Sequence, residues 1–330
     1  MHITEVWEGR SFAAMAIKGL LLPFSGVYAL GWQMYRSVYQ LGLKKAVEPQ
    51  IPVVCIGNLT TGGTGKTPVT VAITQILAAS GRTIVVGASG YGSPAAEGAS
   101  VAPDGPLDPL QWGDEPALLR SLLPAVPLIV GRARVKAAQL CAQHFPHAVL
   151  LMDDGFQHLP LQKHVTVLVE PSWLTNHFCL PAGPYREPRG NRRLANILLG
   201  PEGHFQIVQQ LLTFTTINGQ VAEVPKQAQM LCAIGSPQRF LESLRTSGVE
   251  VICQRALPDH DRLDAGTLFE GMEAAVPIVV TAKDWVKLQR RSDVPTNLLI
   301  AHLAVDITPV EAFKSRLLSL LEAHESQGTR

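Results

Sequence analysis

From residue 51 onward, short runs of β-branched residues alternate with stretches of helical character, and this alternation is what most restricts the possible folds. The expected strands are residues 51–56, 83–86, 126–130, 148–152 and 165–169, and the expected helices are residues 66–79, 115–123 and 135–144. Strands that alternate with helices build a mostly parallel sheet. Because these runs are apolar throughout, we expect helices on both faces of the sheet.

A second set of similar runs follows later in the chain. Its expected strands are residues 230–234, 249–253, 278–281 and 298–301. The stretch 205–220 separates the two sets and predicts a short ribbon or hinge that turns at Asn218 and Gly219. A chain of 330 residues is long enough for two cores. We therefore expect an α/β fold with two α/β/α domains, covering residues 46–204 and 205–330, after an N-terminal segment 1–45.

That N-terminal segment predicts contact with a membrane. Residues 12–32 are rich in apolar and aromatic side chains, but Lys18, Pro23 and several glycines interrupt them. A clean transmembrane helix needs about 20 predominantly apolar residues. We interpret the segment as a membrane-associated helical anchor at the interface, with Lys44 and Lys45 near anionic headgroups. A helical hairpin packed on the protein core is the alternative.

The charge balance argues against nucleic acid as a partner. The chain has 28 Lys and Arg against 27 Asp and Glu, for a net charge of +1. Non-specific binding to nucleic acid needs a strongly basic surface. The five cysteines form no CxxC pair and no zinc spacing, so a structural zinc site is not expected.

The first expected strand runs into a glycine-rich turn and then a helix, which is the context of a phosphate-binding P-loop. Backbone N–H groups of such a loop bind phosphate, a lysine reaches the β and γ oxygens, and a hydroxyl binds magnesium. Thr60 stands where the general pattern has glycine, and the alternative is a plain turn before a helix. The residues expected to bind a nucleotide are Thr60, Thr61, Gly62, Gly63, Thr64, Gly65, Lys66 and Thr67.

Two groups of acidic residues lie at element ends. Asp153 and Asp154 follow the apolar run 148–152, as a Walker B carboxylate follows its strand and holds Mg²⁺. The alternative is a solvated turn. Asp114 and Glu115 precede a helical run, where the helix dipole alone favours acids. The functional interpretation is that these acids include a general base for an acceptor hydroxyl. The structural and the functional interpretation both remain open at this point.

Six motifs in order then resemble a known family. They are IGNLTTGGTGKTP, GDEP, DDGFQH, LPAGPYREP, PDH and TAKD, spanning about residues 51–287. Together they resemble the tetraacyldisaccharide 4′-kinase family, the lipid A kinases of Gram-negative bacteria, whose P-loop tolerates Ser or Thr where Thr60 stands. The resemblance implies ATP and Mg²⁺ as cofactors and transfer of the γ-phosphate to an acylated glucosamine disaccharide 1-phosphate. It also implies a peripheral or monotopic protein at the cytoplasmic face of the inner membrane, which we expect to be a monomer.

The same resemblance implies roles for individual residues. Asp114 matches the catalytic base, and His260 matches its partner although Asp261 departs from the family pattern. The implied magnesium ligands are Thr67, Glu115, Asp153 and Asp154. Lys66 is implied in catalysis, Arg134 and Asn58 in substrate binding, and Gln157, Arg186 and Glu187 in nucleotide binding. The TAKD motif, with Lys283 and Asp284, is expected to support the fold or the hinge rather than catalysis.

Two rival functions remain from the residues themselves. One is a P-loop kinase of a soluble metabolite, in which the N-terminal segment is merely structural. The other is a regulatory NTPase that switches conformation on hydrolysis and needs no acceptor. Acids poised for an acceptor hydroxyl argue against the second.

Overall fold

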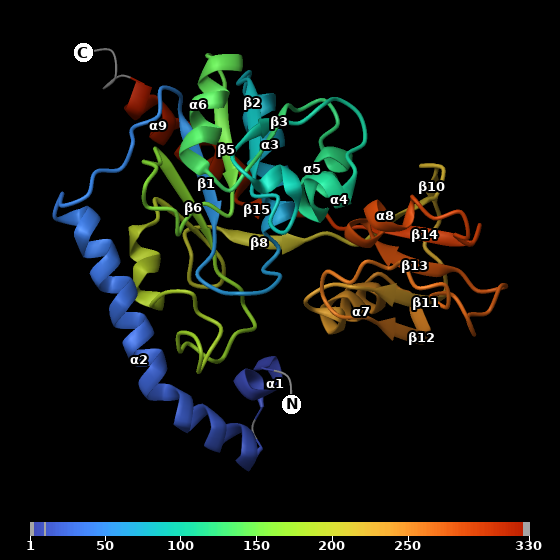
Figure 1. Ribbon diagram of the computed structural model, residues 1–330. Helices are drawn as coiled ribbons and strands as arrows, with labels where there is room; N and C mark the ends of the chain where they lie inside the picture. Colours follow the sequence, from blue (N-terminus) through green and yellow to red (C-terminus); the bar gives the residue numbers. More distant parts are fainter. Residues whose placement is uncertain (1–2, 10, 326–330) are drawn as a thin grey trace.

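The computed structural model describes residues 3–9 and 11–325 and shows two sheets side by side, with a long helix along one flank (Figure 1). The first sheet has the strand order β3-β4-β2-β5-β1-β6-β7. Its strands are β1 (Val53–Gly57), β2 (Ile84–Ala88), β3 (Ser100–Val101), β4 (Leu128–Val130), β5 (Val149–Asp153), β6 (Val165–Val169) and β7 (Ile197–Leu199). All pair in parallel except β3, which is antiparallel to β4. The predicted mostly parallel sheet is confirmed.

Helices cover both faces of this sheet. Alternate side chains of each buried strand therefore pack into two different hydrophobic cores, one on each face. Val54 and Ile56 of β1 pack with α3 (Lys66–Ala79) and α9 (Val310–Glu325), whereas Val53 packs with α6 (Arg134–His144). The other helical elements of this part are η1 (Pro94–Ala96), α4 (Pro109–Trp112), α5 (Asp114–Leu122) and η2 (Arg189–Leu194). The observed bounds of α3 are those predicted from the sequence.

The second sheet has the order β10-β9-β14-β13-β11-β12. Its strands are β9 (Thr213–Thr216), β10 (Val221–Ala222), β11 (Gln227–Cys232), β12 (Glu250–Ala256), β13 (Ile278–Thr281) and β14 (Leu298–His302). Strands β11 to β14 are parallel, and α7 (Pro237–Thr246) and α8 (Ala282–Leu288) enter the cores on its two faces. The expected hairpin turn lies between β9 and β10, where Gly219 has a φ of 78°.

Two antiparallel strands carry the chain between the sheets. They are β8 (Gln206–Gln209) and β15 (Val305–Thr308), so the ribbon pairs segments about a hundred residues apart rather than neighbours within 205–220. After β15 the chain returns to the first sheet, where Phe313, Leu317 and Leu321 of α9 are buried in its core. Residues 210–304 are thus inserted between β8 and β15, and we call them the inserted unit. Because α9 belongs to the core of the first sheet, the two cores are not divided at residue 205 along the chain.

The N-terminal part forms the expected helical segment. After α1 (Ile3–Glu8), residues Phe12–Gln40 form one uninterrupted helix, α2, in which Pro23 is accommodated. An interior proline removes one backbone hydrogen bond and costs about 3 kcal/mol, which a helix of 29 residues tolerates here. The residues that interrupt the apolar stretch therefore do not break the helix. The alternative of a hairpin packed on the core was wrong, because only Ala14, Ser25 and Arg36 of α2 are buried.

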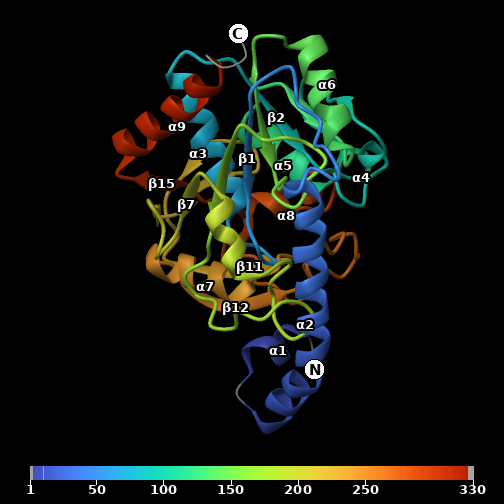
Figure 2. The same ribbon diagram turned by 90° about the vertical axis from the view of Figure 1, so that its left-hand side faces the viewer.

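Helix α2 extends beyond the body of the protein, with α1 beside its outer part (Figure 2). By length and composition it is sufficient to cross a membrane, and 11% of its most apolar window is buried. The large side chains on its exposed surface include Phe12, Leu20, Phe24, Val27, Leu30 and Met34. This exposed apolar helix is consistent with the expected membrane association.

Candidate active site

The loop between β1 and α3 is braced from inside by its own side chains. The Asn58 side chain is fully buried and donates hydrogen bonds to Thr64 Oγ1 at 2.8 Å and to Thr60 Oγ1 at 3.3 Å. Gly62 and Gly65 have φ values of 88° and 79°, which L side chains rarely adopt. The turn therefore keeps the shape in which backbone N–H groups and a helix N-terminus bind phosphate.

Lys66 is the first residue of α3 and points back toward the loop. Its Nζ lies 3.3 Å from Asn58 Oδ1 and 3.7 Å from Asp154 Oδ1. Strand β5 pairs with β1 so that Asp153 is level with Ile56. The P-loop and the acidic strand end are therefore neighbours at one edge of the sheet, as the sequence predicted.

The two adjacent carboxylates have opposite electrostatic surroundings. Burial, reinforced by the nearby Glu115 carboxylate, raises the pKa of Asp153 to about 7, and Thr70 donates a hydrogen bond to its Oδ1 at 3.2 Å. Burial also acts to raise the pKa of Asp154, but the charges of Lys66 and Arg186 outweigh it and bring that pKa to about 2. Asp154 is thus held as an anion, whereas the pKa of Asp153 lies close to neutral pH.

Arg186 connects the acidic strand end with the loop. Its Nη1 and Nη2 bind the two carboxylate oxygens of Asp154 at 3.1 and 2.8 Å, and Nη2 also contacts Asn58 Oδ1. The backbone N–H of Arg186 donates to Leu59 O at 2.7 Å. The predicted residues Lys66, Arg186, Asp154 and Asn58 therefore form one cluster, with Asn58 inside it rather than on an open surface.

Other predicted residues lie behind this cluster. Glu187 is fully buried and accepts a hydrogen bond from Gln157 Nε2 at 2.9 Å. Arg134 is also buried, and its Nη2 donates to the backbone carbonyl of Asp153 at 2.6 Å. Their contacts support the sheet edge and the loop. Direct contact of Glu187, Gln157 or Arg134 with nucleotide or acceptor stays a prediction.

The second predicted centre joins the two sheets. His260, in the loop after β12, places Nδ1 3.2 Å from Asp114 Oδ2, at the start of α5. Lys287 of α8 places Nζ 3.0 Å from the same oxygen and donates to Asp261 O at 2.8 Å. Burial acts to raise the pKa of Asp114, but His260 and Lys287 outweigh it and leave that pKa below its usual value. The expected approach of His260 to Asp114 is thus present, with a lysine added.

The chain matches a known protein family over most of its length. A family model described as tetraacyldisaccharide-1-P 4′-kinase matches residues 17–322. The chain belongs to this family. Proteins named tetraacyldisaccharide 4′-kinase from Shewanella woodyi and Aromatoleum aromaticum are 32% and 35% identical to it over 311 and 301 residues. These alignments cover 92% and 85% of this chain, and 89% and 87% of the two relatives.

A solved structure supports the same fold. LpxK from Aquifex aeolicus, crystallised as an "apo" form in complex with ATP, matches with a TM-score of 0.78 at 23% identity. The match covers 92% of this chain and 99% of the other. As a member of the tetraacyldisaccharide 4′-kinase family the protein is an ATP-dependent kinase, which confirms the function class expected from the six motifs.

Sequence reasoning missed two basic residues of this kinase. Lys287 was assigned no role, although its side chain is only 6% exposed and touches Asp114. Lys283 and Lys287 are four residues apart after a buried strand, which places both on one helix face and was the available signal. Arg239 of α7 was also missed, and its Nη1 donates to Gly63 O in the P-loop at 3.2 Å. The guanidinium of Arg239 also stacks on the Trp173 ring, 3.4 Å from its centroid.

The expected role of the TAKD motif agrees with the contacts of Asp284. This buried carboxylate accepts hydrogen bonds from Thr281 Oγ1 at 2.6 Å and from Ala233 N at 3.0 Å. It therefore ties the start of α8 to the end of β11. Lys283 Nζ lies 3.1 Å from Asp259 Oδ1, beside His260.

The donor set at the strand end fits magnesium in its chemistry. Within residues 3–9 and 11–325, no group of three or more His, Cys, Asp or Glu side chains converges as a metal site. Mg²⁺ prefers oxygen ligands and keeps several waters, so one or two carboxylates and a hydroxyl suffice. The neighbouring negative charge that raises the pKa of Asp153 is what a cation would offset.

Proposed function

We propose that the protein transfers the γ-phosphate of ATP to the 4′-hydroxyl of tetraacyldisaccharide 1-phosphate, with Asp114 as general base. The observation that carries this proposal is the Asp114 carboxylate, held by His260 and Lys287 and followed by Glu115, whose charge acts on Asp153 at the strand end next to the P-loop. A kinase must orient and partly deprotonate an acceptor hydroxyl while the transferred phosphoryl group is held in line. The two clusters supply these two tasks separately.

On the nucleotide side, the P-loop amides and Lys66 neutralise the β and γ phosphates. Arg186 can also bind the negatively charged phosphates. Its carboxylate partner, Asp154, is shared with Lys66. When bound, Mg²⁺ supplies further charge neutralisation, and Thr67, Glu115, Asp153 and Asp154 are the residues that would hold it. Catalysis on this side consists of positioning and electrostatic stabilisation.

On the acceptor side, Asp114 takes the hydroxyl proton. Both His260 and Lys287 contact Oδ2, and we assign Oδ1 to the acceptor hydroxyl. His260 and Lys287 orient the carboxylate, and their hydrogen bonds favour its ionised form. In phosphoryl transfer this residue acts chiefly by orienting the nucleophile, so a pKa below the usual value is compatible with the role.

The acceptor reaches this site from a membrane surface. The exposed apolar side chains of α2 would enter the cytoplasmic leaflet of the inner membrane, which is also where an acylated disaccharide resides. Peripheral or monotopic attachment keeps both sheets in water, where ATP is supplied.

The proposal is tested by label transfer. Purified protein is incubated with γ-labelled ATP, Mg²⁺ and either a detergent-dispersed acylated disaccharide 1-phosphate or the corresponding water-soluble sugar. We expect label on the lipid, at a rate far above that on the sugar. Preferential labelling of the soluble sugar would support a metabolite kinase instead, and hydrolysis unaffected by any acceptor would support a regulatory NTPase.

A further inference from the structure

The inner face of α2 is polar, which reverses the usual arrangement of a surface helix. Four polar side chains at helical spacing, Ser25, Tyr28, Gln33 and Arg36, all contact the segment 179–191 of the first sheet's unit. Many of the large apolar side chains of α2 are exposed instead, while Tyr28 and Ala29 pack against the core. Hydrogen bonds and one ion pair therefore add to the limited apolar packing that holds the helix to the body.

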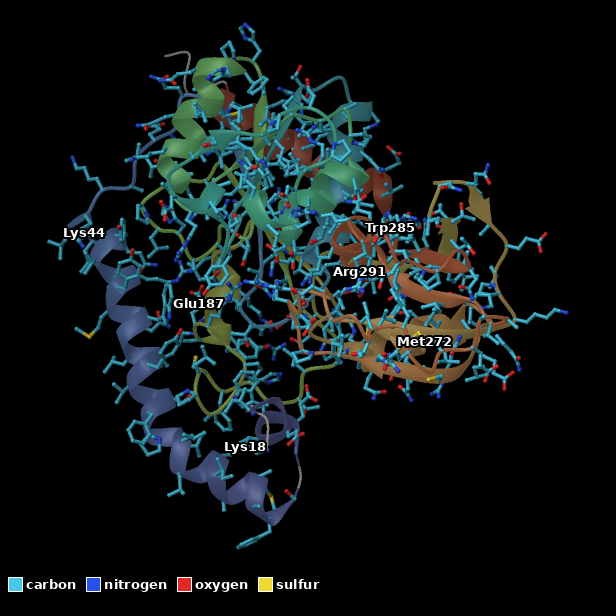
Figure 3. All side chains as sticks on the ribbon, turned by 45° about the vertical axis from the view of Figure 1, so that its right-hand side comes forward. Lys18, Lys44, Glu187, Met272, Trp285 and Arg291 are labelled. Atoms are coloured by element: carbon cyan, nitrogen blue, oxygen red, sulfur yellow. The ribbon has the colours of Figure 1, made fainter. Side chains whose placement is uncertain are left out.

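The ion pair is the strongest of these contacts. Arg36 Nε and Nη2 lie 2.5 and 2.9 Å from the two carboxylate oxygens of Glu187, and both side chains are buried. The Arg36 guanidinium also lies 4.8 Å from the centroid of the Phe156 ring. Figure 3 shows Glu187 between α2 and the body of the protein, with Lys18 on α2 and Lys44 just beyond the helix's C-terminal end. A planar bidentate pair of this kind fixes orientation as well as distance.

From Glu187 the contacts continue to the P-loop. Gln157 Nε2 donates to Glu187 Oε1 at 2.9 Å and to Asn58 O at 2.8 Å. Asn58 in turn holds Thr64 and contacts Lys66. A continuous series of buried and partly buried polar contacts therefore joins α2 to the loop expected to bind phosphate.

A second route passes through the backbone of Arg186. The Tyr28 hydroxyl donates to Arg186 O at 3.0 Å, while Arg186 N donates to Leu59 O at 2.7 Å. The residue that carries the guanidinium is thus held from one side by α2 and from the other by the P-loop. The side chain of Arg186 binds Asp154.

We propose that Tyr28 and Arg36 are positioning residues of the nucleotide site, so that the helix that contacts the membrane also holds Arg186 and the P-loop in their binding geometry. The inference rests on the proposed function, because it takes the loop 58–65 to be the place where ATP binds. It gives α2 a role in catalysis that is separate from anchoring. Both residues would act through Arg186, Glu187 and Gln157 rather than by contact with the nucleotide.

The test measures ATP affinity in the absence of acceptor, using the full chain in detergent micelles and titration calorimetry. Tyr28→Phe removes one hydroxyl and should raise the Kd for ATP about threefold. Arg36→Met should raise it about tenfold or more, since it leaves Glu187 buried without its cation. Arg36→Lys keeps the charge but not the bidentate geometry, and we expect an intermediate Kd.

Ser37→Ala is the matched control. It also removes a hydroxyl from α2, but Ser37 Oγ bonds only to Gln33 O within the helix. Its Kd for ATP should equal that of the wild type. All four variants should still sediment with vesicles of phosphatidylethanolamine and phosphatidylglycerol, because their apolar surface is unchanged.

The possible results distinguish failure of the positioning role from failure of the proposed function. If wild-type protein binds ATP and Tyr28→Phe binds it equally well, while its unfolding temperature falls, the contacts are only structural and the inference fails. A loss of ATP affinity that appears equally in Ser37→Ala would also overturn it. If the wild type itself binds no ATP, the proposed function fails first. Should Arg36→Met not fold, the Tyr28→Phe measurement still decides.

Discussion

The two halves of the proposed reaction site are built differently. The nucleotide side comes from one unit: Lys66, Asp154 and Arg186 all belong to the elements around the first sheet. The acceptor side is composite, because Asp114 begins α5 of the first unit while His260 and Lys287 come from the inserted unit. ATP binding should therefore depend little on how the two units meet, whereas phosphoryl transfer should depend on it strongly.

Removing the base should separate the two sides most clearly. In Asp114→Asn we expect turnover to fall by roughly 100- to 10,000-fold, since general-base catalysis is lost. The Kd for ATP should stay near the wild-type value. Both quantities are measured on the same preparation, by label transfer and by calorimetry. Asp104→Asn, an exposed carboxylate in the preceding loop, serves as the control. Near-native turnover of Asp114→Asn would remove this residue from the role of base.

Changing the nucleotide side should affect both quantities together. Lys66→Met removes a cation aimed at the phosphates, and we expect turnover to fall roughly 100- to 1,000-fold with weaker ATP binding. Lys136→Met removes an exposed lysine of the neighbouring helix α6 and should change neither value. If Lys66→Met lost turnover but bound ATP normally, the division between the two sides would be wrong.

The contribution of the inserted unit is tested by a pair of lysines on one helix. Lys287→Met removes the charged contact to Asp114 Oδ2, and the loss of one such hydrogen bond corresponds to roughly 10- to 100-fold in turnover. Lys283→Met, one helical turn earlier, removes only the contact to Asp259 and should have a much smaller effect. ATP affinity should be unchanged in both. Equal losses in the two variants would argue for a general weakening of α8 instead.

The smallest effect is expected at the contact between Arg239 and the P-loop. This is the place where the inserted unit touches the nucleotide side, through Gly63 O and the Trp173 ring. A stacked cation contributes about 1 kcal/mol, so Arg239→Met should reduce turnover about fivefold. Arg245→Met, at an exposed position of the same helix, is the comparison. If Arg239→Met reduced turnover as much as Lys287→Met, the nucleotide side and the acceptor side would both depend on contact between the two units.

Much of the first unit was predictable because its signals are local. A buried strand, a glycine turn and a helical pattern occur in succession, and the observed α3 begins and ends where the sequence indicated. The carboxyl ends of parallel strands meet at one edge, so the proximity of Asp153 and Asp154 to the P-loop followed from the fold class. The approach of His260 to Asp114 came from the family resemblance rather than from any local pattern.

The parts that escaped prediction depend on contacts between distant segments. Lys287 and Asp114 are 173 residues apart, and nothing near either one identifies the other. The pairing of β8 with β15 and of Arg36 with Glu187 is equally remote. The helical character of the N-terminal segment was predicted, but the polar contacts that hold α2 in place come from the distant residues 179–191.

The return of α9 to the first sheet has a consequence for biogenesis. During translation the ribosome releases β1 to β8 first, but their hydrophobic core lacks Phe313, Leu317 and Leu321 until the final helix emerges. The inserted unit, whose own core is complete before β15, can collapse earlier. The nascent nucleotide-binding half must therefore wait, with apolar surface uncovered, until nearly the whole polypeptide has been synthesised.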